Sequence, residues 1–188
     1  MVVLTRQRWF EKPFTVNIGG TNVTAKQSVR YLGFQLYEKL TYFEHLTRTA
    51  EKANEIAASL ARIMPNTSGS RYAKRRLLQS VVHSVILYGA KIWADQLTQE
   101  KYRQKLAAAQ RRAALRVACA YRTTSEAAIL VITKTIPIDL MAKERERLQE
   151  RRSAGTLDDT TRELERKQTL ENGHAGGKTL TQGDGRPN

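Results

Sequence analysis

The 188-residue sequence is poor in the residues that build stapled or metal-centred folds, with one cysteine, three histidines and four prolines. A single cysteine, Cys119, excludes an intramolecular disulfide framework and fits a reducing compartment. The histidines are too scattered to form a zinc site with it. No apolar run approaches the ~20 residues of a membrane-spanning helix, so we expect no membrane partner. These absences predict an intracellular protein with an ordinary hydrophobic core.

Acidic residues are also scarce, because 18 Asp/Glu stand against 32 Lys/Arg and the net charge is +14. Residues 1–40 hold six basic and two acidic residues, 65–97 hold five and one, and 98–123 hold seven and one. The segment 41–64 is balanced, and 124–188 contains eleven of each sign. A basic surface of this kind attracts a polyanion such as nucleic acid. The excess of positive charge lies in segments that are expected to fold, not in the C-terminal tail.

Clustered carboxylates are lacking too. A polymerase or nuclease that works with two metal ions needs such a cluster. Asp158 and Asp159 are paired, but they lie in a polar stretch without a flanking hydrophobic strand. We interpret them as a helix cap or a loop pair. The sequence therefore predicts no catalytic residue, no metal site and no cofactor in this chain.

The hydrophobic pattern predicts a mainly α-helical fold with about five helices. Thr41 and Glu44 form a capping box, and apolar residues then repeat at spacings of three and four through residue 64. Later helices are predicted over residues 70–95, 98–120, 123–133 and 138–152, with Thr98 and Thr123 as N-caps. The second of the five is apolar around more than half its circumference and is predicted to be largely buried. We expect residues 153–188 to form a polar, disordered tail.

Short alternating segments precede the helices. Gly19 and Gly20 lie between two of them and suit a two-residue hairpin turn with positive φ. Residues 28–36 alternate with period two, which predicts a half-buried strand that carries Tyr31-Leu32-Gly33. We expect a small antiparallel β edge in residues 1–40, which needs another element to pack on.

Two basic clusters are candidate anion-binding surfaces. One occupies the first turns of the predicted second helix, where the macrodipole disfavours cations but free N–H groups favour an anion. The other falls within about 60° on the third helix, beside its apolar stripe. Either cluster can instead be a solvated surface, the second by extending its side chains along the core edge. We favour phosphate contact, because Glu100 is the one acid in residues 98–123. The clusters are Arg71, Lys74, Arg75 and Arg76, and Lys101, Lys105, Arg112 and Arg116.

Four segments, in this order, resemble the C-terminal part of reverse transcriptases from non-LTR retrotransposons, in the clade that inserts into ribosomal RNA genes. The first is Tyr31-Leu32-Gly33 followed by Lys39-Leu40-Thr41 and an alanine-rich helix. The others are RRLLQSVVHSVILYGAKIWAD (75–95), AAAQRRAALRVACAYRTTSEAA (107–128) and IPIDLMAKER (136–145). The resemblance extends over residues 16–152, which is most of the chain.

This resemblance implies different roles for residues 1–40 and 41–152. Residues 1–40 would end the polymerase palm, with Tyr31, Leu32 and Gly33 in the primer grip, the hairpin that holds the 3′ end of the primer. Residues 41–152 would form the thumb, which clamps the RNA/DNA template–primer duplex through its backbone, and the two basic clusters are the candidates for that contact. The upstream palm would be a missing partner. The parent polyprotein would be a nuclear RNA-directed DNA polymerase that uses magnesium, with an endonuclease elsewhere.

Three functional interpretations remain open from the sequence. The chain is a noncatalytic part of a retrotransposon Pol polyprotein, a self-standing basic helical module that binds nucleic acid, or a helical scaffold whose basic surface binds an acidic protein. Salt-dependent binding to a duplex favours the first two, whereas binding to a protein partner that is insensitive to salt favours the third.

Overall fold

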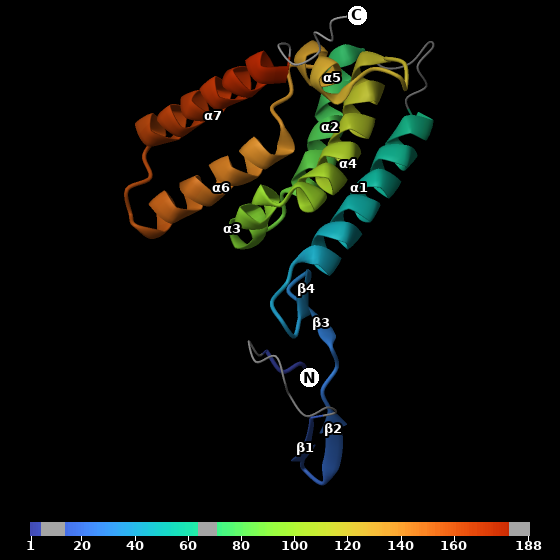
Figure 1. Cartoon of the computed structure of the whole chain (residues 1–188), viewed down its shortest axis with the longest axis vertical. Coiled ribbons are helices and arrows are strands. Elements are labelled where there is room, and N and C mark those ends of the chain that lie inside the picture. The colour runs from blue at the N-terminus through green and yellow to red at the C-terminus, as the bar shows by residue number, and fades with distance from the viewer. Residues whose placement is uncertain (5–13, 64–70, 181–188) are drawn as a thin grey trace, which may run out of the picture. The chain divides into compact units, whose positions relative to one another are not determined.

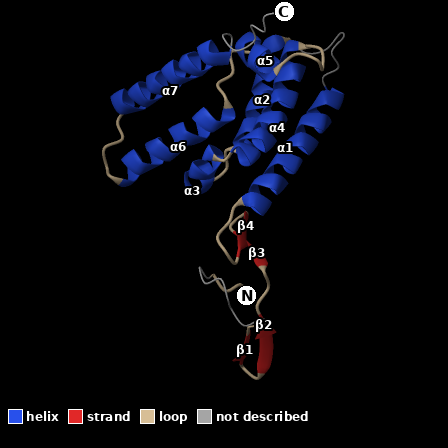
Figure 2. Ribbon diagram, viewed as in Figure 1, coloured by secondary structure: helices blue, strands red, loops and turns tan. Residues whose placement is uncertain are grey.

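The computed structural model describes residues 1–4, 14–63 and 71–180, with side chains described as far as Gly173. The chain forms two compact units, residues 1–48 and residues 49–188. Strands occur in the first unit and helices dominate the second (Figure 2). This confirms the predicted mainly α fold with a small antiparallel β region. The described residues contain seven α-helices, more than the five expected.

The first unit contains two separate β-hairpins, not one continuous edge. Strand β1 (Thr15–Ile18) pairs with β2 (Thr21–Thr24), and β3 (Ser28–Tyr31) pairs with β4 (Phe34–Tyr37). Gly19 and Gly20 form the first turn with φ of 57° and 81°, as predicted. In the second hairpin Tyr31 lies opposite Phe34, so the turn consists of two residues.

The strand predicted over residues 28–36 is wrong, because the chain reverses at Leu32 and Gly33. Their φ values are 47° and 84°. A two-residue turn with positive φ at both positions matches the right-handed twist of the flanking strands. The alternating pattern was compatible with either structure, because each arm of the hairpin keeps its own period of two. Gly33 adopts this conformation at little cost, whereas Leu32 is sterically strained in it.

The first helix, α1 (Phe43–Ile63), begins in the first unit and continues into the second. In the second unit α2 (Tyr72–Ile86) and α4 (Glu100–Ala118) lie side by side (Figure 1). Ala57 of α1, Val82 of α2 and Ala113 of α4 line one small, partly open pocket, while the close packing is between α2 and α4. The predicted stripe of α4 is the buried one. Its buried members are Tyr102, Leu106, Ala109, Ala113 and Val117.

The helix predicted over residues 70–95 is interrupted. It ends at Ile86, and Gly89 adopts a left-handed conformation with φ of 61° before α3 (Ala90–Trp93) and the 3-10 helix η1 (Ala94–Thr98). The break buries the Trp93 ring completely, and its indole Nε1 donates a 3.0 Å hydrogen bond to the Tyr88 carbonyl. A straight helix would place this ring elsewhere, so the burial of Trp93 depends on the bend.

The prediction that this segment is largely buried is also wrong. Leu77 is 69% exposed, and Val81, Tyr88 and Ile92 are exposed as well. Ser80 and Ser84, on the same side of α2, donate hydrogen bonds to the backbone carbonyls of Leu77 and Val81. Their hydroxyls are therefore satisfied within the helix. An apolar side of α2 is left uncovered in the second unit.

Two predicted caps are replaced by neighbouring residues. Helix α5 (Glu126–Ile132) is capped by Ser125, whose Oγ accepts a hydrogen bond from the Ala128 N–H, and not by Thr123. Helix α4 starts after Gln99, because the Thr98 hydroxyl donates to the Asp95 carbonyl instead of capping. Asp158 does cap a helix, since its Oδ1 accepts from the Thr161 N–H at 2.6 Å. That outcome confirms the interpretation of Asp158 as a capping residue.

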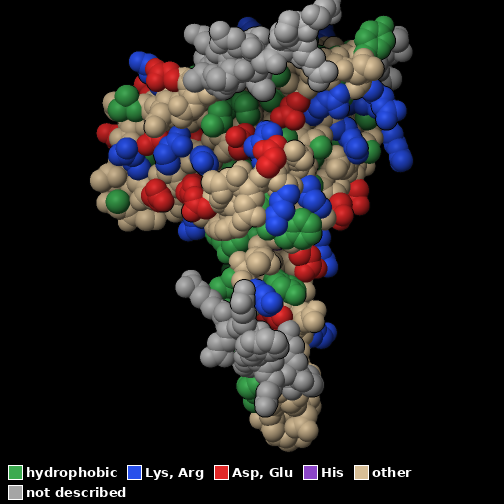
Figure 3. Space-filling view, in the orientation of Figure 1, with side chains coloured by type: hydrophobic (Ala, Val, Ile, Leu, Met, Phe, Trp, Pro, Cys, Tyr) green, Lys and Arg blue, Asp and Glu red, His purple; other side chains and the backbone are tan. Residues whose placement is uncertain are grey.

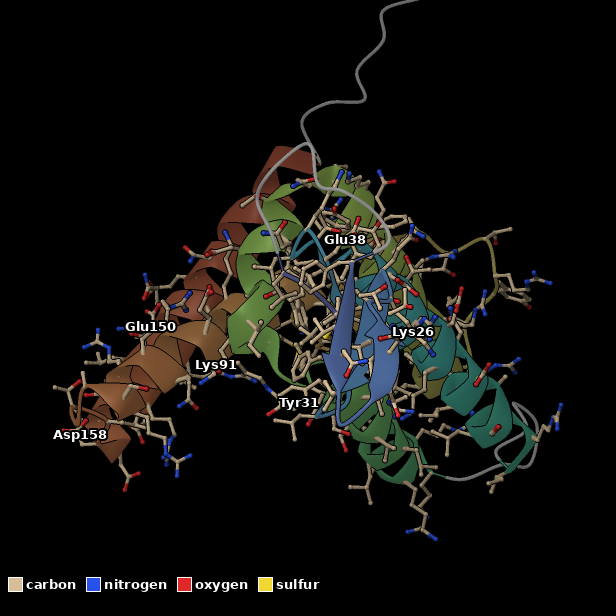
Figure 4. The ribbon with its side chains drawn as sticks, turned by 90° about the horizontal axis from the view of Figure 1, so that it is seen from below. Lys26, Tyr31, Glu38, Lys91, Glu150 and Asp158 are labelled. Carbon is tan, nitrogen blue, oxygen red and sulfur yellow. The ribbon has the colours of Figure 1, made fainter. Side chains whose placement is uncertain are left out.

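Helix α6 (Ile138–Ser153) follows the prediction, but the expected disordered tail is wrong over α7 (Asp159–Leu180). Figure 1 shows α7 packed along α6 as a helical hairpin, and in Figure 4 Asp158 marks the start of α7. Glu165 of α7 is 4% exposed and accepts hydrogen bonds from Arg147 and Arg151 of α6. Ion pairs between helices therefore order a segment whose composition indicates disorder. Residues 181–188 lie outside the described part of the chain.

No single helix among the described residues is both long and apolar enough to cross a membrane. The bent pair formed by Tyr72–Ile86 and Ala90–Thr98 meets the two criteria together, with a 50° angle between its parts.

Candidate nucleic-acid interface

The N-terminus of α2 presents three exposed cations. Arg71 is the N-cap residue and makes no side-chain capping hydrogen bond, and no acidic residue lies in the first turn. Arg71, Lys74 and Arg76 are all exposed to solvent. The first turn of a helix has backbone N–H groups that lack intrahelical partners, so it favours an anion. Three of the four residues predicted for this cluster are therefore placed where a phosphate can reach them.

Arg75, the fourth member of that cluster, is buried, unlike the other three. Its side chain is 4% exposed, and its Nη1 donates a 3.1 Å hydrogen bond to the backbone carbonyl of Arg116. A buried guanidinium must be hydrogen-bonded to offset its lost hydration. Arg75 thus joins α2 to α4, and its inward position follows from the helical period that also buries Gln79, Val82 and Ile86.

The predicted cluster on α4 extends along much of the helix. Arg112 and Arg116 are exposed, and no hydrogen bond or ion pair engages their guanidinium groups within the described residues. The Lys101 ammonium lies 4.8 Å from the centre of the Tyr102 ring, and Lys105 is half-buried. At a rise of 1.5 Å per residue, the distance from Lys101 to Arg116 along the axis is about 22 Å.

The acid at the start of α4 is already engaged by another residue. Glu100 accepts hydrogen bonds from Arg103 and Gln104, and these bonds lower the pKa of its carboxyl to about 2. Arg103 also lies 3.8 Å from Glu126 of α5. The acids near α4 are therefore paired with Arg103, which the sequence analysis did not include in the cluster. The positive charge of the predicted cluster is not offset by them.

The contact between Arg75 and Arg116 shows which parts of the two clusters meet. It places the start of α2 beside the C-terminal part of α4, so Arg71, Lys74 and Arg76 lie at the same end of the helix pair as Arg112 and Arg116. Lys101 and Lys105 lie towards the opposite end of α4. Figure 3 shows Lys and Arg side chains gathered over α1 and α4, on the side away from α6 and α7.

The three residues of the predicted primer grip belong to the first unit. Tyr31 is 60% exposed and Leu32 is 71% exposed at the tip of the β3–β4 hairpin. In Figure 4 the Tyr31 side chain extends away from its strand. A hairpin with an exposed, apolar tip can contact a ligand without disturbing a core.

Sequence reasoning gave no role to Arg111, although it holds the loop between α4 and α5. Its guanidinium donates hydrogen bonds of 2.6 Å to the carbonyls of Arg122 and Thr124, and a third of 3.1 Å to Thr124. The Arg111-Arg112 pair could have indicated this difference, because consecutive side chains lie about 100° apart on a helix and so cannot face the same partner. Arg111 fixes a loop, whereas Arg112 is exposed.

Among the residues with described side chains, His45, His83 and Cys119 belong to no candidate metal site. His45, expected at the surface or core edge, is buried, and its Nδ1 lies 3.5 Å from the Gln35 N–H group that donates to it. His83 contacts Gln110, and burial next to Arg145 lowers its pKa to about 4. Cys119 ends α4 in a left-handed conformation and is exposed. In the described part of the chain, no three His, Cys, Asp or Glu residues lie close enough to hold a metal ion.

Comparison with known proteins gives one informative similarity. No family model matches the chain, and no solved structure matches it. The chain is 30% identical over 130 residues to the 115 kDa protein in type-1 retrotransposable element R1DM of Drosophila melanogaster. The match includes 69% of this chain and 13% of that protein, so the chain spans a small part of its relative. The similarity supports a protein derived from a non-LTR retrotransposon.

Proposed function

We propose that this chain is a noncatalytic part of a retrotransposon Pol polyprotein and that it binds the template–primer duplex. The similarity to a retrotransposon protein supports the origin, and the order of the sequence segments supports a position after the polymerase palm. RNA-directed DNA synthesis and its magnesium requirement belong in this proposal to the parent protein. The observation that carries the binding role is the cluster of exposed cations on α2 and α4.

The proposed contact is with the phosphate backbone. Arg71, Lys74 and Arg76 on α2, with Arg112 and Arg116 on α4, present five exposed cations at one end of the helix pair. Lys101 and Lys105 continue the cluster along α4. Contacts of this kind position a duplex without reading its sequence, and they suit the shape of an RNA–DNA hybrid. Arg75 is removed from the predicted set because its guanidinium holds the two helices together.

The β3–β4 hairpin has a separate role in this proposal. Its exposed tip, formed by Tyr31, Leu32 and Gly33, would contact the 3′ end of the primer. Tyr31 offers an aromatic ring for that contact, and Gly33 allows close approach of the backbone. No cofactor takes part in either contact.

The test is the salt dependence of binding to an RNA–DNA hybrid duplex. If about five phosphates are neutralised, log K should fall with log salt at a slope of about −4 to −5. Changing Lys101, Lys105, Arg112 and Arg116 together to Gln should flatten this slope by about three units. Circular dichroism should show unchanged helicity, because these side chains are outside the core.

The matched control removes four other exposed cations, in the variant Lys91→Gln, Arg152→Gln, Arg162→Gln and Lys167→Gln. Lys91 is on α3, and the others are on α6 and α7 (Figure 1), so none of the four belongs to the proposed contact. We expect a slope close to that of the native chain. Equal losses in both quadruple variants would show that only net charge matters, and would overturn the assigned surface.

A basic scaffold that binds an acidic protein is the competing function. The uncovered apolar side of α2, with Leu77 and Val81, is the observation that favours it. Duplex binding that is weak and insensitive to the α4 variant would support this alternative.

A further inference from the structure

The loop between α4 and α5 is held in a defined conformation. Cys119 adopts a left-handed conformation at the end of α4, and the Ala120 N–H then donates to the Leu115 carbonyl at 3.0 Å. The Thr124 N–H donates to the Tyr121 carbonyl at 3.1 Å, which closes a tight turn. The Arg111 guanidinium binds the carbonyls of Arg122 and Thr124 from the helix side. Both ends of this turn are therefore tied to α4.

Tyr121 is displayed on this turn without support for its ring. Its side chain is 86% exposed, more than that of any other exposed large hydrophobic residue in the described structure. No hydrogen bond or ring contact within residues 14–63 and 71–173 engages it. Tyr72 differs, because its hydroxyl donates to the Thr133 carbonyl. The backbone of this turn is already ordered, so less conformational entropy is lost when a partner binds to the exposed ring.

The surroundings of Tyr121 are basic. Arg122 follows it and is exposed, and Arg116 lies on the last turn of α4. Proteins that bind single-stranded nucleic acid combine such cations with exposed aromatic rings, on which unpaired bases stack. A base inside a duplex cannot stack in this way, because both of its faces are covered by neighbouring bases. The ring therefore suits a single strand better than the duplex.

We propose that Tyr121 stacks on an unpaired base of a single-stranded extension next to the bound duplex, and that Arg122 contacts the phosphate of that extension. Arg111 acts as a positioning residue, because it holds the turn without contacting the nucleic acid. This inference rests on the proposed function, since it adds a single-stranded ligand to the duplex surface of α2 and α4.

The experiment compares the full chain bound to a blunt RNA–DNA hybrid and to the same hybrid with a short single-stranded extension. We expect the extension to raise the affinity about fivefold or more. Tyr121→Ala should abolish this gain and leave the affinity for the blunt hybrid unchanged. Tyr121→Phe should keep it, because the ring remains. Arg111→Gln should reduce the gain without changing the sequence of the turn.

Tyr88→Ala is the matched control, because Tyr88 is an exposed tyrosine in the same unit and is 54% exposed. It should retain the full gain. A gain that survives in Tyr121→Ala, or an extension that adds no affinity to native protein, overturns the inference and leaves duplex binding intact. Absence of salt-dependent binding to the blunt hybrid overturns the proposed function instead. A 2-aminopurine base in the extension gives an independent readout, because its emission should change on stacking in native protein and not in Tyr121→Ala.

Discussion

Arg75 of the α2 cluster donates a 3.1 Å hydrogen bond from its guanidinium to the backbone carbonyl of Arg116 in the α4 cluster. The Arg116 side chain itself remains exposed. The Arg75 side chain thus stabilises the packing of α2 on α4, while the Arg116 side chain extends into solvent next to it. The two residues differ because the carbonyl of Arg116 is turned towards α2 and its side chain is not.

This relationship predicts opposite effects for adjacent arginines. Arg75→Gln should lower the free energy of unfolding by about 1–3 kcal/mol, because a buried hydrogen bond is lost. Arg76→Gln should leave stability within about 0.5 kcal/mol and flatten the salt slope of duplex binding by about one unit. Urea denaturation and binding titrations measure both. A destabilised Arg76→Gln, or a flattened slope in a folded Arg75→Gln, would contradict this assignment.

The two sides of α2 should also respond differently to truncation. Leu77→Ala is expected to change stability by no more than about 0.5 kcal/mol, because the side chain is 69% exposed. Ile86→Ala should cost about 2–5 kcal/mol, since Ile86 is completely buried in the same helix and a cavity is left. Urea denaturation of both variants provides the comparison. A large loss in Leu77→Ala would mean that this side is covered in solution.

The spacing of apolar residues predicts that α2 is a helix, but it does not predict which side of that helix is buried. Apolar spacing identified a helix, and it correctly identified the buried stripe of α4, where alanines and Leu106 leave one possible inner side. In α2 apolar residues occupy both sides, so spacing cannot show whether Leu77 or Val82 faces the core. The inner side was decided by Arg75 and Gln79, two polar residues that are buried because α4 and the Thr133–Thr135 segment provide hydrogen-bond partners.

His83 should make the second unit acid-sensitive in a defined range. Burial lowers its pKa from 6.5 to about 4, so the unfolded chain binds more protons than the folded one between these values. Stability is complete above pH 6.5 and falls as the pH drops towards 4. The loss between pH 6.5 and 5 should be on the order of 2 kcal/mol. Urea denaturation at several pH values tests this.

His83→Gln is the control for that titration. Glutamine can keep a polar contact with Gln110 but has no titrating group, so the variant should lose clearly less stability over the same range. An identical pH profile in the variant would assign the acid sensitivity to another group. His45, whose pKa is also lowered by burial, belongs to the first unit and is the next residue to examine.

We expect Leu32 to destabilise the β3–β4 turn while it provides an apolar side chain for contact with the primer end. Its φ of 47° is unfavourable for leucine, and asparagine tolerates this turn position much better. Leu32→Asn should therefore stabilise the β3–β4 hairpin by about 1 kcal/mol. Hydrogen exchange of the hairpin amides measures that gain. If the tip contacts the primer end, the same variant should bind a recessed primer end less tightly while its hairpin is better protected.

The partners of charged residues were the least predictable feature. Mixed charge in residues 143–152 indicates pairs within one helix, yet Glu144 pairs with Arg166 and Arg147 pairs with Glu165, both across to α7. Composition gave no sign of α7, because few of its side chains are apolar and it is ordered by the surface of α6. Local patterns can identify an amphipathic helix, but they do not show which distant charges will be brought within reach. The domain boundaries predicted at residues 40 and 152 stay predictions.

Cys119 gives the molecule a built-in attachment point for a probe. It is the single cysteine of the sequence, and its thiol is exposed where α4 ends. A maleimide dye can therefore be attached at one known position without altering any other residue. Tyr121 and Arg122 follow it within three positions, so the dye would sit beside the proposed strand-binding turn. Energy transfer from this dye to labels at successive positions of a bound hybrid would give the orientation and register of the nucleic acid on the native sequence.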